Sequence, residues 1–479
     1  MGLEIVNQWR GNKIWGREKR WIDVRDPQDN SLIESVPAAS AEEMHQALEE
    51  AAAGAGIAAN MAVHERMAIL HRAADLIQER TETFAVTIAR EGSKTIREAR
   101  KEARRCVDTL RLSAEEARRI NGETISFDQS PGSENRMGYY GRFPVGLIGA
   151  ITPFNDPLNL VAHKAGPAVA AGNAILIKPS SLTPLSALLL AKTLEEAGLP
   201  SGVCTVVTGH GSEVGDVLVR DPAVRMISFT GGVEAGEAIT RKAGLKKLSM
   251  ELGSNSPVIV LDDADLEEAV ASTVSGAFWA AGQNCLGVQR VYVQSGLFDA
   301  FAEAFLRRVR TYRIGDKLSE ETDMGPLITE GEALRVERWV DEALHKGARL
   351  LAGGKRDGAF YAPTVLMDVP DHCQLAREEI FGPVVSLYRV KDLDEGIREA
   401  NRSPYGLQAG IFTRDLEKSF RMIREARVGG VMVNDSSDYR IDAMPFGGTK
   451  MSGLGREGVR FAIEEMTETK VVCFRLRRH

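Results

Sequence analysis

The segment Val145-Gly-Leu-Ile-Gly-Ala-Ile151 decides the fold of this chain. It is a short apolar run, and it leads directly into a loop that begins Thr152-Pro153-Phe154-Asn155. Similar short runs rich in apolar and β-branched residues follow it, and helical patterns lie between them. Strand–helix–strand alternation of this kind predicts a parallel sheet with helices on both faces. The further strands are expected at residues 174–178, 204–208 and 225–230, and the helices at 184–198 and 212–219.

A second alternation follows residue 251 and predicts a second α/β domain. Upstream of the first sheet, residues 40–121 carry apolar side chains at three- and four-residue spacing, which predicts helices. Residues 135–143 and 469–476 show polar alternation and are expected to form strands that can add to a neighbour's sheet. The predicted fold class is α/β, with two Rossmann-like α/β domains and a small β arm. In the second domain, strands are expected at 258–261, 291–293, 384–390 and 429–434, and helices at 266–281 and 298–312.

The composition is that of a globular protein that binds neither nucleic acid nor membrane. The 479 residues carry a net charge of −7, which gives no reason to expect nucleic-acid binding. The longest apolar stretch, 165–177, contains Gly, Pro and Asn and is too short to cross a bilayer. Five cysteines are scattered without a C-x-x-C or Cys/His pair, which argues against a disulfide framework and against a metal site. A cytoplasmic location is expected.

Cys285, at the end of the run Phe278-Trp279-Ala280-Ala281-Gly282-Gln283-Asn284-Cys285, is a candidate nucleophile. Glu251 lies upstream in an apolar context and could activate a water molecule. A thiol near its free pKa of about 8.5 is only a few per cent thiolate at pH 7, so a nucleophilic cysteine needs local activation. Taken singly, an isolated cysteine is more often a small buried apolar residue.

Polar residues follow several of the expected strands. The amide of Asn155 could donate to an oxyanion, although an Asn beside a proline also suits a turn. Lys178, at the end of the next strand, could bind a ribose or a phosphate, or could be a solvated loop lysine. The glycine turn after Thr230 could place N–H groups against a pyrophosphate, or could serve tight helix–strand packing. Glu379 and Phe381 could lie beside a nicotinamide ribose, or could form part of a capping turn before a strand.

The order of these motifs is more specific than any one of them. Phe-Asn, Lys-Pro-Ser, Phe-Thr-Gly, Glu-Leu-Gly, Gly-Gln-x-Cys, Glu-x-Phe-Gly-Pro and Pro-Phe-Gly-Gly occur in succession between residues 154 and 448. In this order they resemble the aldehyde dehydrogenase superfamily, from about residue 20 to the C-terminus. Residues 434–465 look most like bacterial and archaeal members that act on lactaldehyde, glyceraldehyde 3-phosphate and related short polar aldehydes.

The resemblance implies an NAD(P)-dependent, non-acylating aldehyde dehydrogenase. It makes Cys285 the nucleophile, Asn155 and the Cys285 N–H the oxyanion donors, and Glu251 the base that lets water release a carboxylic acid. The presence of Glu251 disfavours the CoA-acylating members, and Lys178 also counts among the catalytic residues. The cofactor is expected to contact Thr152, Pro153, Phe154, Lys178, Ser180, Ser181, Gly211, Gly215, Phe229, Thr230, Gly231, Leu252, Glu379 and Phe381.

The resemblance also implies domain boundaries and an oligomer. Residues 1–124 and 145–252 are expected to form the NAD(P)-binding domain, 253–450 the catalytic domain, and 125–144 with 451–479 the oligomerisation segments. A homodimer or homotetramer is expected, with the terminal strand completing a partner's sheet.

Two departures from the family pattern bear on the cofactor. Ser181 stands where NAD-preferring relatives commonly have Glu. A 2′-phosphate could therefore be accepted, and NADP is slightly favoured over NAD. Gly232 stands where the family often has Ser against the pyrophosphate, which leaves that contact to backbone donors.

The substrate is expected to be a short polar or anionic aldehyde. Arg104, Arg105 and Arg111 fall on a helix that lines the substrate tunnel in relatives, and Ser437 and Arg440 precede the Pro-Phe-Gly-Gly loop. An arginine facing the pocket would favour a carboxylate, phosphate or sulfonate, whereas a solvated helix face is the other explanation for any one of them. The alternatives are a succinate-semialdehyde type of dehydrogenase, a thioester-forming or esterase activity without net oxidation, and a non-catalytic member of the family.

Overall fold

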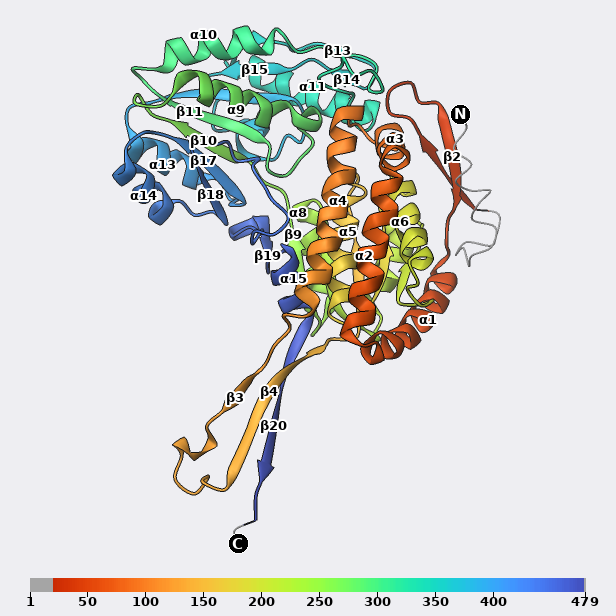
Figure 1. The fold of residues 1–479 in the computed structure, drawn as a ribbon. Coiled ribbons are helices and arrows are strands. Elements are labelled where there is room, and N and C mark those ends of the chain that lie inside the picture. Colours follow the sequence, from red (N-terminus) through yellow and green to blue (C-terminus); the bar gives the residue numbers. More distant parts are fainter. Residues whose placement is uncertain (1–19, 478–479) are drawn as a thin grey trace.

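The computed structural model describes residues 20–477 and contains two largely parallel β-sheets, each with helices packed on both faces (Figure 1). Apolar side chains fill a separate core on each face of each sheet. In the first sheet, Ile175 packs into one core and its neighbour Leu176 packs into the other. Successive side chains of a strand point to opposite faces, so a strand covered on both sides must be apolar throughout. The predicted α/β fold class is confirmed.

The first sheet has six strands in the order β19-β9-β8-β5-β6-β7. All neighbours in it are parallel except β19 and β9. Parallel neighbours need crossover connections, and helices supply most of them here. The strands are β5 (Leu147–Ile151), β6 (Ala174–Lys178), β7 (Cys204–Val206), β8 (Val224–Thr230), β9 (Lys247–Glu251) and β19 (Gly453–Leu454).

The helices predicted around the first sheet are present. The region 40–121 forms four helices, two of which begin with a side-chain capping box. The helix expected at 184–198 is α6, and the one expected at 212–219 is a π-helical turn at Gly211–Gly215 that continues into α7. The helices are α1 (Ala41–Asn60), α2 (Val63–Glu79), α3 (Thr81–Glu91), α4 (Ile96–Ala117), α5 (Asn159–Ala170), α6 (Leu185–Glu196), α7 (Asp216–Arg220), α8 (Val233–Ala243) and α15 (Val459–Glu465).

The second sheet has seven strands in the order β12-β15-β16-β11-β10-β17-β18. Only the pair formed by β12 and β15 is antiparallel. The four strands predicted from the sequence of this half are β10, β11, β16 and β18. The strands are β10 (Ser256–Val260), β11 (Val288–Gln294), β12 (Arg349–Ala352), β15 (Thr364–Met367), β16 (Val384–Val390), β17 (Gln408–Phe412) and β18 (Gly430–Val433).

One helix of the second half ends earlier than its sequence pattern predicts. The pattern extends over 266–281, but α9 stops at Phe278. Ala280 and Ala281 have positive φ angles of 51° and 55°, which a right-handed helix cannot contain. The helix predicted at 298–312 likewise ends at Val309. The helices are α9 (Leu266–Phe278), α10 (Phe298–Val309), α11 (Glu330–His345), α12 (Gln374–Arg377), α13 (Leu393–Arg402) and α14 (Leu416–Glu425).

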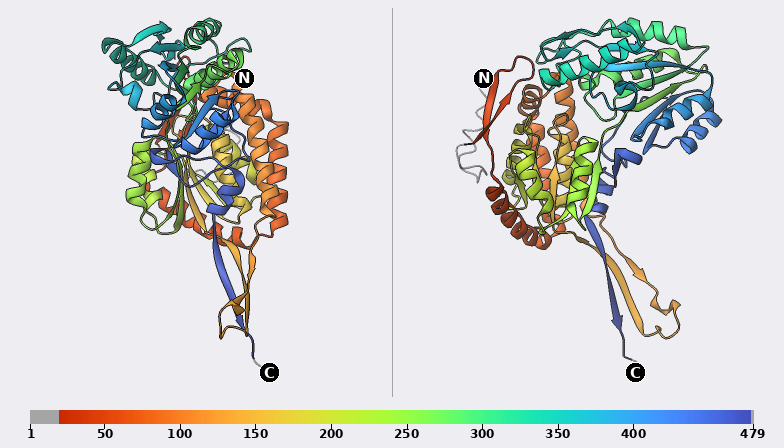
Figure 2. Two further views of the ribbon diagram at one scale, coloured as in Figure 1. Left: turned by 90° about the vertical axis from the view of Figure 1, so that its left-hand side faces the viewer. Right: turned by 180° about the vertical axis from the view of Figure 1, so that it is seen from behind.

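A three-stranded antiparallel sheet projects from the body of the molecule as an arm (Figure 2). The strands predicted at 135–143 and 469–476 are β4 and β20, and Thr467 pairs with Pro144 where the arm begins. The role of this arm in joining subunits and the division into functional domains stay predictions. Of the predicted segments, residues 1–19 and 478–479 lie outside the described part. The arm strands are β3 (Glu123–Ile125), β4 (Arg136–Pro144) and β20 (Thr467–Arg475).

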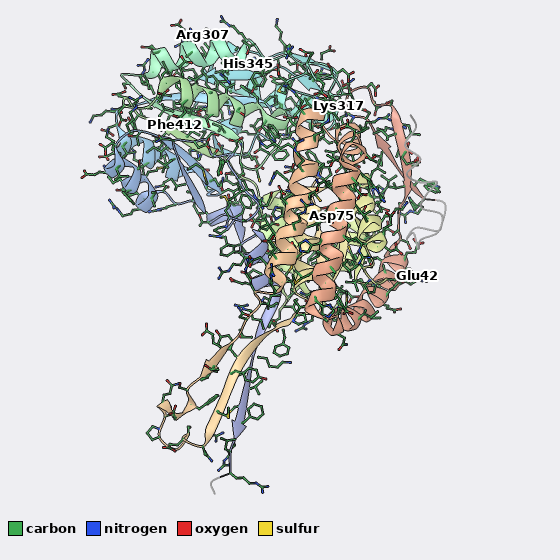
Figure 3. All side chains as sticks on the ribbon, viewed as in Figure 1. Glu42, Asp75, Arg307, Lys317, His345 and Phe412 are labelled. Atoms are coloured by element: carbon green, nitrogen blue, oxygen red, sulfur yellow. The ribbon has the colours of Figure 1, made fainter. Side chains whose placement is uncertain are left out.

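Lys317, labelled in Figure 3, ties the N-terminal region to the second half of the molecule. Its ammonium group lies 2.7 Å from Asp26 and donates to the carbonyl oxygens of Arg90 and Gly92 at 2.9 and 2.8 Å. Between residues 20 and 477, no helix is both long and apolar enough to cross a membrane. The remaining strands form two hairpins, β1 (Trp21–Arg25) with β2 (Leu32–Pro37) and β13 (Arg356–Asp357) with β14 (Phe360–Tyr361).

Candidate active site

The strands of the first sheet end side by side, and most of the predicted cofactor residues lie at this edge. In the strand register, Ile151 lies opposite Lys178 of β6 and Phe229 of β8, and Thr230 lies opposite Glu251 of β9. The loop that begins at Thr152 therefore leaves the sheet at the same level as Lys178 and Glu251. The carboxyl edge of a parallel sheet is where α/β folds bind ligands.

This edge has hydrogen-bond donors without partners and open space beside Gly232. The hydroxyl groups of Thr152 and Thr230 are buried and have no hydrogen-bond partner within residues 20–477. Gly232 lies just before the first turn of α8, and no atom lies within 4 Å of the position that a Cβ would take there. Free N–H groups at a helix N-terminus attract a phosphate. The Lys178 ammonium donates to the Pro179 carbonyl at 2.9 Å, and burial lowers its pKa to about 8.

The other predicted cofactor residues surround the same edge. The hydroxyl of Ser181 donates to the Gly209 carbonyl at 3.1 Å. Gly211 and Gly215 bound the π-helical turn and have open space where a Cβ would lie. Leu252 packs so closely against α8 that a Cβ on Gly236 would lie 2.5 Å from it. Within the same region, Pro153 is half-buried in the loop after β5, Ser180 accepts the Leu182 N–H at 3.2 Å, and the Gly231 N–H donates to the Glu251 carbonyl at 3.0 Å.

Glu379 and Phe381 come from the second half of the chain and reach the first. Glu379 accepts the Ser254 N–H at 2.8 Å, and burial raises its pKa to about 7. Phe381 has a positive φ of 43°, and its ring meets that of Phe154 edge to face with centroids 5.7 Å apart. The structure therefore brings together Phe154 and Phe381, two predicted cofactor residues that are far apart in sequence.

Cys285 lies in a loop that begins with a left-handed backbone segment, in which Ala280, Ala281 and Gly282 all have positive φ angles. The residue is half-buried and packs against a small apolar cluster that includes Phe446. Burial raises the pKa of the Cys285 thiol to about 12, with a further increase from nearby carboxylates, including Glu251. The thiol is thus protonated at neutral pH in this structure, and a base must remove its proton.

Glu251 has the properties of such a base. It is 2% exposed, and neither carboxylate oxygen has a hydrogen-bond partner within the described residues. Burial raises its pKa well above the usual value, the negative charge of Glu457 raises it further, and Arg440 and Lys164 oppose the shift. A carboxylate with a raised pKa binds a proton more strongly, which suits general-base catalysis near neutral pH.

Beside Glu251 lies a buried charge cluster that the sequence motifs do not predict. The Lys164 ammonium lies 2.8 Å from Glu457 and donates to the Ser228 hydroxyl at 3.0 Å, and Arg440 lies 3.4 Å from the other oxygen of Glu457. These cations hold the pKa of Glu457 below its usual value despite burial, so Glu457 stays charged. Its negative charge raises the pKa of both Glu251 and Cys285. The available signal was a lysine, Lys164, in a largely apolar segment, residues 159–170, whose other polar residues are Asn159 and His163.

The predicted substrate residues differ in what their side chains contact. Arg105 donates to Asp442 through Nη2 at 2.7 Å and Nε at 3.3 Å, and that carboxylate also lies 2.7 Å from the ring of His163. Arg440 lies over the Phe446 ring, 3.7 Å from its centroid. Its side chain is 8% exposed, and its Nε is buried without a hydrogen-bond partner in the described chain.

The remaining candidates contribute in other ways or lie on the surface. The Ser437 hydroxyl donates to the Leu286 carbonyl at 2.7 Å and so holds the residue next to Cys285. Arg104 is exposed, and Arg111 contacts Asp75 at 2.9 Å on the outside of the helices. Asn155 is half-buried in the loop between β5 and α5.

Known proteins resemble the chain over nearly its whole length. The model of the aldehyde dehydrogenase family matches residues 15–472. The chain is 52% identical over 452 residues to aspartate-semialdehyde dehydrogenase 1 of Pseudomonas canavaninivorans, covering 94% of this chain and 96% of the relative. It is 45% identical over 465 residues to 3-sulfolactaldehyde dehydrogenase of Priestia aryabhattai, covering 97% of each. The solved glyceraldehyde-3-phosphate dehydrogenase GapN of Methanocaldococcus jannaschii, complexed with NADP, matches with a TM-score of 0.92 at 42% identity, covering 96% of this chain and 100% of that chain.

Proposed function

The chain belongs to the aldehyde dehydrogenase family, and we propose that it oxidises a short anionic aldehyde to a carboxylic acid through a thioester on Cys285, with NAD or NADP as the hydride acceptor. One observation carries the proposal. The Cys285 thiol packs against the apolar cluster that includes Phe446, and the buried Glu251 carboxylate lies 3.0 Å from the position that a Cβ would take on the next residue, Gly447. Within the described residues this carboxylate has no hydrogen-bond partner. A thiol and a strong base so placed suit covalent catalysis on a carbonyl group.

The chain's own residues account for the first half of the reaction. Glu251 takes the proton of the Cys285 thiol, and the sulfur forms a bond to the aldehyde carbon. The carbonyl oxygen becomes an oxyanion, to which the Asn155 amide and the Cys285 N–H donate. A bound nicotinamide cofactor would supply the hydride acceptor for that carbon, and loss of the hydride would leave the acyl group as a thioester on the Cys285 sulfur.

The second half is hydrolysis. The proton that Glu251 took from the thiol first leaves to solvent. Glu251, again a carboxylate, then takes a proton from water as the oxygen attacks the thioester carbon, and it returns this proton to the departing Cys285 thiolate. The carbon–sulfur bond breaks, the carboxylic acid leaves and the thiol is restored. The residues that would hold the cofactor are Thr152, Lys178, Thr230, Glu379 and Phe381, because their unpaired hydroxyls, charge and aromatic face lie at one edge of the sheet.

The proposal is tested by mixing the purified protein with a panel of neutral, hydroxylated, phosphorylated, carboxylated and sulfonated short aldehydes. Each is assayed with NAD and with NADP, and absorbance at 340 nm is followed. We expect formation of the reduced cofactor, with the anionic aldehydes giving the higher kcat/KM. A protein that reduces neither cofactor with any aldehyde would contradict the proposal.

An anionic substrate is supported by Arg440 and by the relatives. Arg440 pairs with Glu457 through Nη2 but keeps a buried Nε without a hydrogen-bond partner in the described residues, and it lies over the Phe446 ring beside Cys285. Arg105, by contrast, donates to Asp442 through both Nη2 and Nε. The relatives named above are dehydrogenases of aspartate semialdehyde, 3-sulfolactaldehyde and glyceraldehyde 3-phosphate, all of which carry an anionic group. A succinate-semialdehyde type of substrate belongs to the same chemical class.

Replacing Arg440 with Gln is expected to lower kcat/KM for anionic aldehydes by about 10- to 100-fold relative to acetaldehyde, because a hydrogen bond to a charged group is worth about 1.5–3 kcal/mol. The measurement is the ratio of kcat/KM for the anionic aldehyde to kcat/KM for acetaldehyde. The ratio is used because Arg440 also lowers the pKa of Glu251, which affects the reaction of every substrate. Arg111→Gln, on the exposed face of α4, is the control and should leave the ratio unchanged. An equal loss with acetaldehyde would show that Arg440 does not select for charge.

Ser181 supports the use of NADP. Replacing Ser181 with Glu is expected to lower kcat/KM for NADP by about 100-fold while NAD is little affected, because a carboxylate there would repel the 2′-phosphate. The Ser181→Gln variant places a side chain of nearly the same shape as Glu at this position but without the charge. It should keep most of the activity with NADP. A kinetic preference of the unmodified protein for NAD, or equal effects of the two variants, would refute this assignment.

A further inference from the structure

Helix α4 carries two buried glutamates, Glu98 and Glu102, four residues apart on one face. They are 4% and 2% exposed. The helix packs against α2 and α5 of the first half, and its first residue, Ile96, donates to the Lys317 carbonyl of the second half at 2.7 Å (Figure 1). It therefore contacts both halves of the molecule. Glu98 binds a loop of the second half, and Glu102 binds a loop of the first half.

Glu98 holds the loop that leads to Cys285. One of its carboxylate oxygens accepts the Ala280 N–H at 2.8 Å, and the other accepts the Thr95 N–H at 2.8 Å. Ala280 and Ala281 have left-handed backbone angles, which cost an alanine free energy unless the surroundings fix them. A carboxylate that accepts the N–H of the first strained residue supplies such a constraint.

Glu102 holds the loop that carries Asn155. One oxygen accepts the N–H groups of Leu158 and Asn159 at 2.8 and 3.0 Å, where α5 begins. The other oxygen pairs with Lys94 at 2.7 Å, and Lys94 also forms an ion pair with Asp156, the residue next to Asn155. Glu102 therefore holds the end of this short loop directly and, through Lys94, also its middle at Asp156.

We propose that Glu98 and Glu102 are positioning residues, which set the place of Cys285 relative to Asn155 by holding both loops from one rigid helix. The inference rests on the proposed roles of Cys285 as nucleophile and Asn155 as oxyanion donor. Four residues of a helix span about 6 Å, so the two anchors have a fixed spacing. A nucleophile and an oxyanion donor must be placed to within a fraction of an ångström, and a shift of about 1 Å can cost about 100-fold in rate.

Two reactions of Cys285 that need neither aldehyde nor cofactor distinguish the role of Glu98 from that of Glu102. Alkylation by iodoacetamide, followed at the Cys285 peptide by mass spectrometry, needs the thiol but no oxyanion donor. Hydrolysis of 4-nitrophenyl acetate needs both, because the thiol attacks an ester carbonyl, 4-nitrophenolate leaves, and water releases acetate from the thioester. Glu91→Ala is the matched control, since Glu91 is also buried and accepts the N–H groups of Leu185 and Ser186, but touches neither loop.

Glu102→Ala should lower ester hydrolysis at least 10-fold and leave alkylation within two-fold. Glu98→Ala should lower both at least 10-fold, and Glu91→Ala should lower neither, although all three variants lose thermal stability. Should an alanine variant fail to fold, Glu98→Gln and Glu102→Gln keep one acceptor oxygen and should show smaller losses in the same pattern. Equal changes in both reactions for all three positions would show that these glutamates only support the fold. A protein that oxidises no aldehyde but shows the expected pattern would refute the proposed function and leave the positioning roles intact.

Discussion

Replacing Cys285 with Ala is expected to lower the rate of aldehyde-dependent NADPH or NADH formation by about 10⁴-fold or more, since no covalent intermediate can form without the sulfur. Binding of the cofactor should be unchanged, because no predicted cofactor contact is lost. The measurements are the initial rate at 340 nm with a saturating aldehyde and the dissociation constant for NADP from protein fluorescence.

Another cysteine provides the control for this experiment. Cys473 lies exposed on β20 of the arm, and Cys473→Ser should retain full activity. The raised pKa of the Cys285 thiol adds a pH test with a definite sign. Because the thiolate is the minor form below pH 12, alkylation of Cys285 in the unmodified protein should rise steadily from pH 6 to pH 9. An alanine variant that keeps more than about a tenth of the activity would exclude the covalent route.

The sequence predicts the central strands β5, β6, β8, β10 and β16 because each is a short, largely apolar run. It does not predict β9, β12, β15, β17 and β19 of the same two sheets. The local sequence pattern is wrong about where α9 ends: it extends to residue 281, but the helix stops at Phe278. Residues 279–281 continue a run of small and apolar side chains, and alanine is the best helix former of all. Ala280 and Ala281 nevertheless have left-handed backbone angles. The Ala280 N–H donates a hydrogen bond to Glu98, which is 182 positions away in the sequence. A tertiary contact of this kind overrides local preference and leaves no mark on the local pattern.

For the candidate site, the sequence predicts which residues to consider but not their electrostatic state. The order of the motifs indicates which residues to consider, and it predicts Cys285, Glu251, Lys178 and Glu379 as site residues. The electrostatic state of those residues could not be predicted, because it depends on burial and on partners that are remote in sequence. Glu457 lies 293 positions from Lys164, with which it pairs. In the same way Arg105 is predicted as a substrate residue, but its pairing with Asp442, 337 positions away, is visible only in the fold.

The second large effect is expected at Glu251. Replacing Glu251 with Gln should lower the steady-state rate by about 10³-fold, since an amide cannot accept a proton from the thiol or from water. The first turnover should still occur slowly and stop after one equivalent of NADPH or NADH per active site, because the thioester then accumulates on Cys285. Adding hydroxylamine, which attacks the thioester without a base from the protein, should release the acyl group as a hydroxamate and restart turnover.

The pH dependence provides an independent check on Glu251. Its pKa is raised by burial and by Glu457, so the carboxylate form is populated only as the pH rises through that raised value. Turnover of the unmodified protein should therefore increase from neutral to alkaline pH. The part of this increase that follows the ionisation of Glu251 should be absent from the hydroxylamine-assisted reaction of Glu251→Gln, which should keep only the steady increase due to ionisation of the Cys285 thiol. Glu464→Gln, at a half-exposed glutamate on α15, should keep the rate and the pH profile of the unmodified protein. If Glu251→Gln turned over at more than a tenth of the normal rate with an unchanged pH profile, another group would have to serve as the base, and the buried carboxylate would have only a structural role.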